Sequence, residues 1–421
     1  MKKLLFSLLI FAAPALLAGQ NTNPELAAHL QKAFEHYPRL VEAQIGVQSA
    51  AVRTDIQRAG YRPTVSSQAS FQYLDPVAEA EFGAGKFQFQ PKDNYNLGLT
   101  GSGLLFDFGK TKAQIDKAVA EAGLAQDNQE ALKNALAYQV AQLFYSIVFT
   151  RKQMSVQTGQ LQSLRANEML TKSKLDNGDA LELDYLNAQV ARANAENRIA
   201  DLEATLEKQM ALMSMLTGET TTTVTTETFD FQKAEVENAA NQNPDLAVAQ
   251  SRILIAEKEI QVNRKFLRPS INYNTGVGFR NGYQPDIAEF RFNWTVGAGI
   301  SYPIYVGGRD KKQLKLSELN LLAARSQAQG ISETISADLL QAAADQRAAQ
   351  AKLKTARTIV AQATAALEIA QSRFKNGVAT NVDVITAQSN LEQAQLTAIS
   401  AEYQQCLAGL QTARLKGVHI W

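Results

Sequence analysis

Four stretches of the chain alternate apolar with polar residues, the pattern of a β-strand with two unlike faces. They lie at about 64–73 and 94–105 in the first part of the chain, and at about 270–280 and 289–302 in the second. Each is roughly ten residues long, the length of a tilted strand that spans a bilayer. A soluble antiparallel sheet with one wet face has the same alternation, so the pattern alone allows both interpretations.

Longer segments with a helical pattern follow each pair of strands. Lys110 to about Asp176 and Arg309 to about Lys375 contain no proline, and returning helices are expected from about 181 to 216 and from 382 to 416. Alanine is abundant along these segments, and small residues let helices approach closely. Polar residues occupy much of the remainder, so we expect solvated antiparallel hairpins rather than membrane spans. An extended coiled-coil rod is the alternative.

The two expected hairpins share one motif at their tips. The motif is Asn177-Gly178-Asp179-Ala180 in the first hairpin and Asn376-Gly377-Val378-Ala379-Thr380 in the second. Asn-Gly tolerates left-handed backbone, so it can end one helix and let the chain reverse into the next. Each motif therefore predicts a turn between two long helices.

The chain as a whole reads as a tandem repeat, which is a signal at the level of the fold. Equivalent positions are Pro38 with Pro244, Pro63 with Pro269, Gly109 with Gly308, and Gly178 with Gly377. The offset shortens between the second and third pairs, in the counterpart of a loop containing Leu74 to Asp93. We expect a signal peptide at 1–19, a first repeat at 20–216, a linker at 217–233, a second repeat at 234–416 and a C-terminal end at 417–421.

The N-terminus indicates export. Lys2 and Lys3 precede an apolar run and a small-residue end near Ala18-Gly19, as in a secretory signal peptide. Gln20 stands where an acylated cysteine would be, so no lipid anchor is expected. With an exported chain, we favour the membrane interpretation of the strands. Four strands cannot span a bilayer alone, because their edges would leave backbone groups unpaired, so we expect an oligomer of two or three chains.

Composition excludes several other functions. The formal net charge is +1, which gives no support to nucleic-acid binding. The only cysteine, Cys406, is expected to pack as a small apolar residue. His29, His36 and His419 show no metal-ligand spacing, and no arrangement of nucleophile, base and oxyanion donors is evident. We therefore expect no enzyme, no cofactor and no metal site.

These features together resemble the TolC-type outer-membrane efflux proteins over essentially the whole mature chain. The resemblance implies an α+β membrane protein and a homotrimer. Each chain would give four strands to a 12-stranded outer-membrane β-barrel and its long antiparallel helices to a periplasmic α-helical barrel. It also implies a passive exit duct that works with a periplasmic adaptor protein and an inner-membrane transporter, in tripartite efflux or type I secretion. The alternative is a trimeric structural or adhesin-like coiled-coil protein without transport.

The resemblance also assigns roles to residues at the tips. The family docks its adaptor on the two tip turns, here Asn177, Gly178, Asp179, Ala180, Asn376, Gly377, Val378, Ala379 and Thr380. It narrows its channel entrance with aspartates just beyond the second tip, where Asp383 matches one position and Thr386 stands at a second, usually acidic one. Asp184 lies in an acidic first tip and is a further candidate for the constriction. Asp383 also fits a capping box with Thr380, so a ring of carboxylates, a helix cap or both remain open.

Overall fold

The computed structural model describes residues 23–83, 85–219, 223–229, 231 and 242–421. The expected signal peptide at 1–19 and part of the expected linker at 217–233 lie outside these residues. The described chain divides into two compact units, which we take in turn. The strand unit comprises 42–129 and 245–332, and the helical unit comprises the described parts of 1–41, 130–244 and 333–421.

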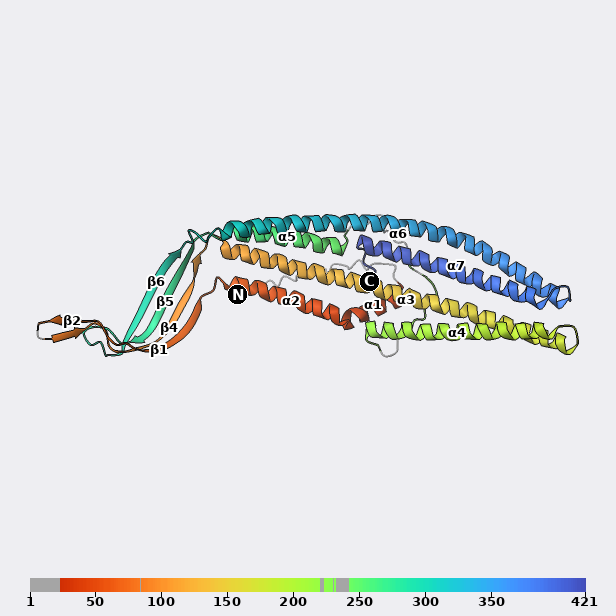
Figure 1. Ribbon diagram of the computed structural model, residues 1–421, viewed down its shortest axis with the longest axis horizontal. Coiled ribbons are helices and arrows are strands. Elements are labelled where there is room, and N and C mark those ends of the chain that lie inside the picture. The colour runs from red at the N-terminus through yellow and green to blue at the C-terminus, as the bar shows by residue number, and fades with distance from the viewer. Residues whose placement is uncertain (1–22, 84, 220–222, 230, 232–241) are drawn as a thin grey trace, which may run out of the picture. The chain divides into compact units, whose positions relative to one another are not determined.

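The strand unit contains one four-stranded antiparallel sheet (Figure 1). Its strands are β1 (Thr64–Tyr73), β4 (Asp93–Phe106), β5 (Ser270–Arg280) and β6 (Arg291–Ser301), in the order β1-β4-β5-β6. The two halves of the tandem sequence therefore each give two neighbouring strands. The outer strands β1 and β6 have no partner on their free edges among the described residues of this chain.

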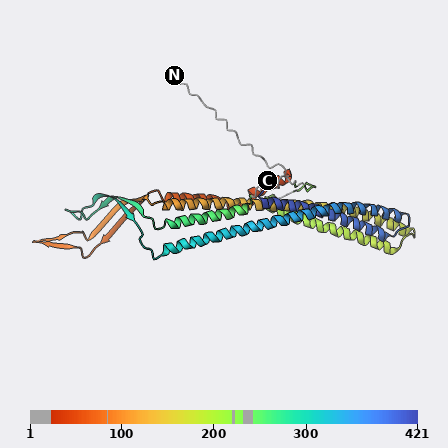
Figure 2. The same ribbon diagram turned by 90° about the horizontal axis from the view of Figure 1, so that it is seen from above.

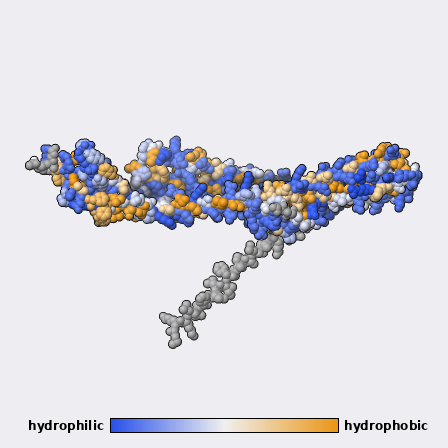
Figure 3. All heavy atoms as spheres, turned by 90° about the horizontal axis from the view of Figure 1, so that it is seen from below, coloured by the Kyte–Doolittle hydropathy of each residue, from blue (hydrophilic) through white to orange (hydrophobic). Residues whose placement is uncertain are grey.

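The register places apolar residues on one face of all four strands. One cross-strand row joins Val65, Gly101, Thr275 and Val296, and another joins Ala69, Leu97, Phe279 and Phe292. Because side chains alternate, the other face is polar, and there the hydroxyls of Ser66 and Thr100 lie 2.8 Å apart. Trp294 and Val296 are 69% and 74% exposed, so no described residue of this chain covers them. Figure 3 shows apolar side chains gathered over the strands.

The loop between β1 and β4 holds two short strands that the sequence analysis missed. β2 (Glu79–Phe82) and β3 (Gly85–Gln88) pair as a hairpin. The alternation Ala80, Phe82 and then Phe87, Phe89 was the available signal, but each strand has only four residues, too few for a periodicity to stand out. The loop between β5 and β6 has no such hairpin, which accounts for the shorter offset there.

Helix α2 (Pro38–Ala59) leads into β1, and α5 (Pro244–Arg264) leads into β5. Helix α3 (Lys110–Asp176) follows β4, and α6 (Arg309–Lys375) follows the turn after β6. Each exit has a left-handed glycine, Gly109 at φ 83° and Gly308 at φ 73°. At the first exit Asp107 accepts hydrogen bonds from the amides of Gly109 and Thr111, at 3.0 and 2.6 Å, and so caps α3.

In the helical unit, α3 and α6 continue and return as α4 (Glu182–Thr217) and α7 (Asn381–Lys416), in two antiparallel hairpins (Figures 1 and 2). The two hairpins have equal helix lengths, with 67 residues in both α3 and α6 and 36 in both α4 and α7. Ile335, Ala342, Ala349 and Ala356 of α6 are buried at seven-residue intervals. This spacing is typical of coiled-coil packing and explains the abundance of alanine.

The core of the helical unit forms where α1 (Pro24–His36) meets the middle of α3 and the ends of α4 and α7. Phe144 and Tyr145 of α3 are fully buried there, and Cys406 is also buried, which confirms its expected packing role. The described part of the linker lies on this core, with Val224 buried and Glu25 of α1 accepting hydrogen bonds from the amides of Thr225 and Thr226, at 2.6 and 2.9 Å.

Candidate functional site

The two helical tips are built by the same hydrogen bonds. In the first, the amides of Asn177, Gly178 and Asp179 donate to the carbonyls of Ser173, Leu175 and Lys174, at 3.2, 3.0 and 2.7 Å. In the second, the amides of Asn376, Gly377 and Val378 donate to the equivalent carbonyls of Ser372, Phe374 and Arg373, at 3.1, 3.1 and 2.8 Å. Both central glycines are left-handed, with φ 82° and 75°. The sequence motif thus encodes one helix-ending turn that occurs twice.

The second tip starts its returning helix with a full capping box. The hydroxyl of Thr380 accepts from the amide of Asp383 at 3.3 Å, and the Asp383 carboxylate accepts from the amide and the hydroxyl of Thr380, both at 2.8 Å. The amide hydrogen bond from Thr380, followed by that from its hydroxyl and by the nearby Arg373 cation, lowers the pKa of Asp383 below its ordinary value. Asp383 is exposed, so its ionised carboxylate also faces solvent.

The first tip has a weaker version of this cap. Asp184 accepts from the amide of Leu181 at 3.4 Å, but a leucine side chain cannot return the hydrogen bond. Asp184 is half-buried, whereas Thr386, one turn after Asp383, is exposed. Of the three residues expected at the constriction, Asp383 and Thr386 therefore share the beginning of α7, and Asp184 begins α4.

A buried polar group connects the two hairpins beside the tips, and the sequence analysis missed it. This tip cluster consists of Asn381 at the start of α7 with Asn167 and Thr171 of α3. Asn381 and Thr171 are fully buried and Asn167 is 7% exposed. The Asn381 side chain accepts from the Asn167 amide at 2.7 Å and donates to the Asp184 carbonyl at 2.9 Å. The Asn381 side chain thus links α3, α4 and α7 of the same protein chain.

A second link joins α3 to the end of α6. The ammonium group of Lys174 donates to the Phe374 carbonyl at 2.8 Å and lies 4.6 Å from the centre of the Phe374 ring. The carbonyl ends a helix, where a cation is electrostatically favoured. With the tip cluster, this contact ties all four helices together near their tips.

Further polar contacts follow the same seam between α3 and α7. Gln388, fully buried, donates to the Ser163 hydroxyl at 2.6 Å, and Glu392 accepts from Gln157 at 2.8 Å and from Arg198 at 3.2 Å. Asn381 and Gln388 are seven residues apart, so both occupy one position of the coiled-coil repeat. A polar residue recurring on an apolar seam was the signal that could have revealed this interface.

Apolar side chains also lie exposed around the tip turns. Leu181 and Leu183 are 69% and 63% exposed at the first tip, and Val378 and Val382 are 65% and 51% exposed at the second. Exposed apolar groups that gather beside polar turns are typical of a surface that binds another protein.

Neither a metal site nor a membrane-spanning helix is found among the described residues. No group of three or more His, Cys, Asp or Glu residues there could hold a metal ion. Among the described helices, none is both long and apolar enough to cross a membrane.

Comparisons with known proteins agree with this architecture. The chain is 22% identical to the outer membrane protein TolC of Vibrio cholerae, over 99% of this chain and 96% of that protein. It is 20% identical to the outer membrane efflux protein BepC of Brucella suis, over 95% and 87%. The solved outer membrane protein VceC of Vibrio cholerae superposes with a TM-score of 0.78 at 19% identity, over 94% and 96% of the two chains. The fold is therefore that of the TolC-type channels.

The tandem repeat also appears in the comparison with protein families. The family described as "Outer membrane efflux protein" matches twice, over residues 29–219 and 236–417. Together these ranges hold most of the chain and nearly all of the described helices and strands. The chain therefore belongs to the outer membrane efflux protein family.

Proposed function

We propose that three copies of this chain form one exit duct that receives its cargo from a periplasmic adaptor and an inner-membrane transporter. The protein is an outer-membrane efflux channel that extends into the periplasm. Three sheets would give twelve strands, enough to pair every edge and to leave an open interior. The exposed apolar face of the sheet would then contact lipid, and its polar face would line the passage.

The observation that carries the proposal is the pair of matched tips. Each tip presents a hydrogen-bonded, glycine-ended turn beside exposed leucine or valine side chains, which is the kind of surface that an apolar partner hairpin can bind. We propose adaptor docking at the nine tip residues named above. The exposed apolar side chains of Leu181, Leu183, Val378 and Val382 would supply most of the contact area.

We further propose that the tips close the channel entrance. Asp383 would face the entrance in each of three chains, and its lowered pKa keeps it ionised at neutral pH. A ring of carboxylates favours cations and disfavours anions. The cap and the ring are compatible, because the capped carboxylate still faces solvent. Thr386 would continue the wall one turn further, and the half-buried Asp184 would contribute mainly by ordering α4.

The cargo is proposed to be small molecules selected by the transporter rather than by the duct. Relatives at 20–22% identity carry names that refer to pyoverdine, to toluene and to cobalt, zinc and cadmium. Such different cargoes on one fold fit a passage that does not itself discriminate. Type I secretion of a polypeptide is the second candidate, since the same wide passage would serve an unfolded chain.

Dye efflux in cells tests the proposal. A strain that lacks related channels is compared with and without this protein for accumulation of a fluorescent efflux dye. Loss of the protein should raise accumulation, and re-expression should restore efflux. Val378→Asp should abolish the restoration while the protein still reaches the outer membrane, because a charge would disrupt an apolar docking surface. Unchanged accumulation with a conducting protein in planar bilayers would indicate polypeptide cargo instead, and absent conductance would refute the duct.

A further inference from the structure

Basic residues gather where the strands of the strand unit give way to its helices. Within 61–63, 107–112, 264–269 and 302–312 the acidic residues are Asp107 and Asp310. The basic residues of the same segments, here called the basic collar, are Arg62, Lys110, Lys112, Arg264, Lys265, Arg268, Arg309, Lys311 and Lys312. The collar therefore carries a strong positive charge at one end of the sheet.

Three of the collar cations already make structural contacts. Lys110 donates to the Arg268 carbonyl at 3.3 Å, and Lys265 donates to the Gly109 carbonyl at 3.2 Å, so the two lysines fix the exits of β4 and α5 against each other. The Arg309 guanidinium lies 5.4 Å from the centre of the Phe266 ring. Buried Asp107 accepts hydrogen bonds from the backbone amides that it caps, and it forms no ion pair with a collar cation among the described residues.

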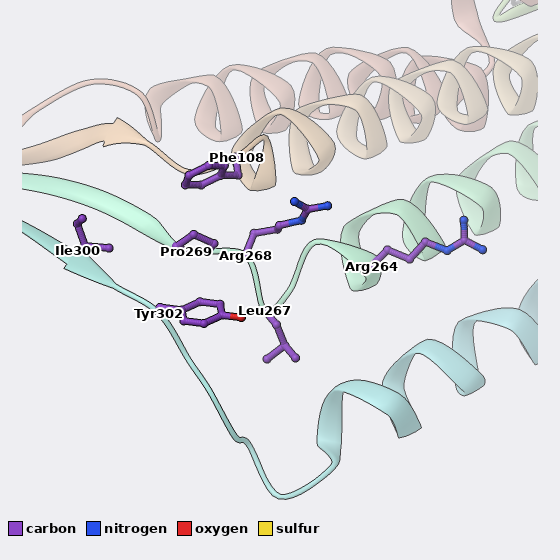
Figure 4. Close-up of a pocket in the computed structure, with 7 residues that line it drawn as sticks. All are labelled: Phe108, Arg264, Leu267, Arg268, Pro269, Ile300 and Tyr302. Carbon is purple, nitrogen blue, oxygen red and sulfur yellow. The ribbon is translucent and has the colours of Figure 1, made fainter.

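Two arginines are different, because they are exposed and lie beside a cavity. Among the described residues, the guanidinium groups of Arg264 and Arg268 have no ion-pair or hydrogen-bond partner. Both line a cavity of about 600 Å³ at the end of β5 and β6 (Figure 4). Unpaired cations at a cavity attract an anion that can form two or more hydrogen bonds to them.

The rest of the cavity wall is apolar and aromatic. Phe108, Ile300 and Tyr302 line it, and the last two are 74% and 60% exposed. Figure 4 shows Ile300 on the side of the strands, while Arg264 and Arg268 lie toward α5. Ile300 shares the apolar face of the sheet, since it pairs with Ile271 in the register. The wall therefore changes from apolar to cationic along the direction from strands to helices.

Among the residues that the structure describes, the opposite end of the sheet has no comparable site. There Lys92 pairs with Asp75 at 2.8 Å, Arg291 forms an ion pair with Glu289, and Arg280 lies 5.2 Å from the Tyr283 ring. Each of these cations already has a partner, and acidic residues are mixed among them. This difference in unpaired positive charge distinguishes the end of the sheet that adjoins the helices from its other end.

From this arrangement we infer that the cavity binds the phosphate headgroup of an anionic glycerophospholipid from the periplasmic leaflet. The apolar face of the sheet contacts acyl chains, the tyrosine lies at the interface, and the two guanidinium groups bind the phosphodiester. The helices extend into the periplasm, so the collar lies at the level of that leaflet's headgroups. A bound lipid would anchor each chain at a fixed depth and orient the sheet against its helices.

Native mass spectrometry of the purified oligomer tests this inference. The protein is titrated with phosphatidylglycerol or phosphatidylcholine in mixed micelles, and bound lipids per oligomer are counted. Phosphatidylglycerol should bind at least about tenfold more tightly. Arg264→Gln with Arg268→Gln should weaken it about 30-fold, as expected for about 1 kcal/mol per basic residue near a lipid surface. The control, Arg280→Gln with Arg291→Gln, removes the same charge at the opposite end and should leave binding unchanged.

Three results would overturn the inference. Equal binding of the two lipids would show that no anionic site exists, and equal losses in the cavity variant and its control would show only non-specific attraction. Full displacement of lipid by millimolar glycerol phosphate would identify a site for free phosphate instead. If the glutamine variant fails to assemble, Arg264→Lys with Arg268→Lys replaces it. This variant keeps both charges, so it should still bind phosphatidylglycerol more tightly than phosphatidylcholine. Loss of that lipid preference in an intact oligomer would also refute the inference.

Discussion

Replacing Asn381 by alanine tests whether the tip cluster holds the entrance closed. Asn381 is fully buried, and its side chain joins Asn167 of α3 to the Asp184 carbonyl of α4. Alanine removes both hydrogen bonds and leaves the buried Asn167 amide unpaired, while the Asp184 carbonyl keeps its bond within α4. The orphaned amide costs about 1–3 kcal/mol and the other lost hydrogen bond about 0.5–1.5 kcal/mol, so the closed arrangement should lose about 2–4 kcal/mol.

This loss of stability in the closed state shifts the equilibrium between closed and open channels. If the helices separate on opening, the same groups are hydrated in the open state, and only the closed state is destabilised. The ratio of open to closed channels should therefore rise about 30- to 1000-fold, at 1.4 kcal/mol per tenfold change. Single channels of Asn381→Ala in planar bilayers should show a higher open fraction or a larger conductance than wild type.

The matched control is Asn390→Ala. Asn390 lies on the same helix α7, is exposed, and makes no hydrogen bond that alanine would remove among the described residues. It should leave both conductance and open fraction unchanged. Wild-type conductance and open fraction in an intact Asn381→Ala oligomer would refute the gating role, and so would equal effects of the two variants.

The remaining predictions concern the entrance charge, the midsection and the backbone. Asp383→Asn should weaken cation preference and Thr386→Asp should strengthen it; bilayer reversal potentials that do not change would contradict the carboxylate ring. Burial works to raise the pKa of Glu25, but hydrogen bonds from Thr226 and Thr225 outweigh it and lower the pKa. The stability that ionised Glu25 provides is therefore present above its unfolded pKa of about 4.5 and is lost as the pH falls below that value. Wild type should have a higher Tm than Glu25→Gln at pH 7, and this difference should shrink by about pH 3.5. Gly417→Ala should lower the free energy of unfolding by at least about 2 kcal/mol, because φ is 70° and the new Cβ would clash with the Gln242 carbonyl oxygen. The control is Gly159→Ala inside α3, where open space surrounds the glycine. This control should raise the free energy of unfolding by about 0.5–1 kcal/mol.

The elements could be predicted from the sequence because their signals are local. A strand of ten residues shows its alternation, a helix of 67 residues shows its freedom from proline, and Asn-Gly marks the turn between helices. Asp383 was predictable as a cap for the same reason, since its partner Thr380 is three residues away. The short hairpin of β2 and β3 has too few residues for such a signal, and it was missed.

The tip cluster could not be predicted, because its members are distant in sequence. Asn167 and Asn381 are separated by 214 residues, and each alone looks like one more polar residue on a polar helix. Only the pairing of the two hairpins shows that both lie on the buried side. The same holds for Arg264 and Tyr302, which share a cavity although one precedes β5 and the other follows β6.

Because the chain is a tandem repeat, the two tips can be compared at equivalent positions. The two tips are equivalent in backbone, yet the position equivalent to Asn381 is Glu182, which is exposed, and the residue equivalent to Thr380 is Leu181, which cannot complete a capping box. The second tip therefore has a well-ordered helix start and a buried polar side chain that reaches both α3 and α4, whereas the first has neither. Duplicated backbones with unequal caps imply unequal mobility: the first tip should open more readily, with the second tip as the fixed point against which it moves. Amide hydrogen exchange should accordingly be faster at 182–186 than at 381–385 in the wild type, and Asn381→Ala should remove most of that difference by accelerating the second tip.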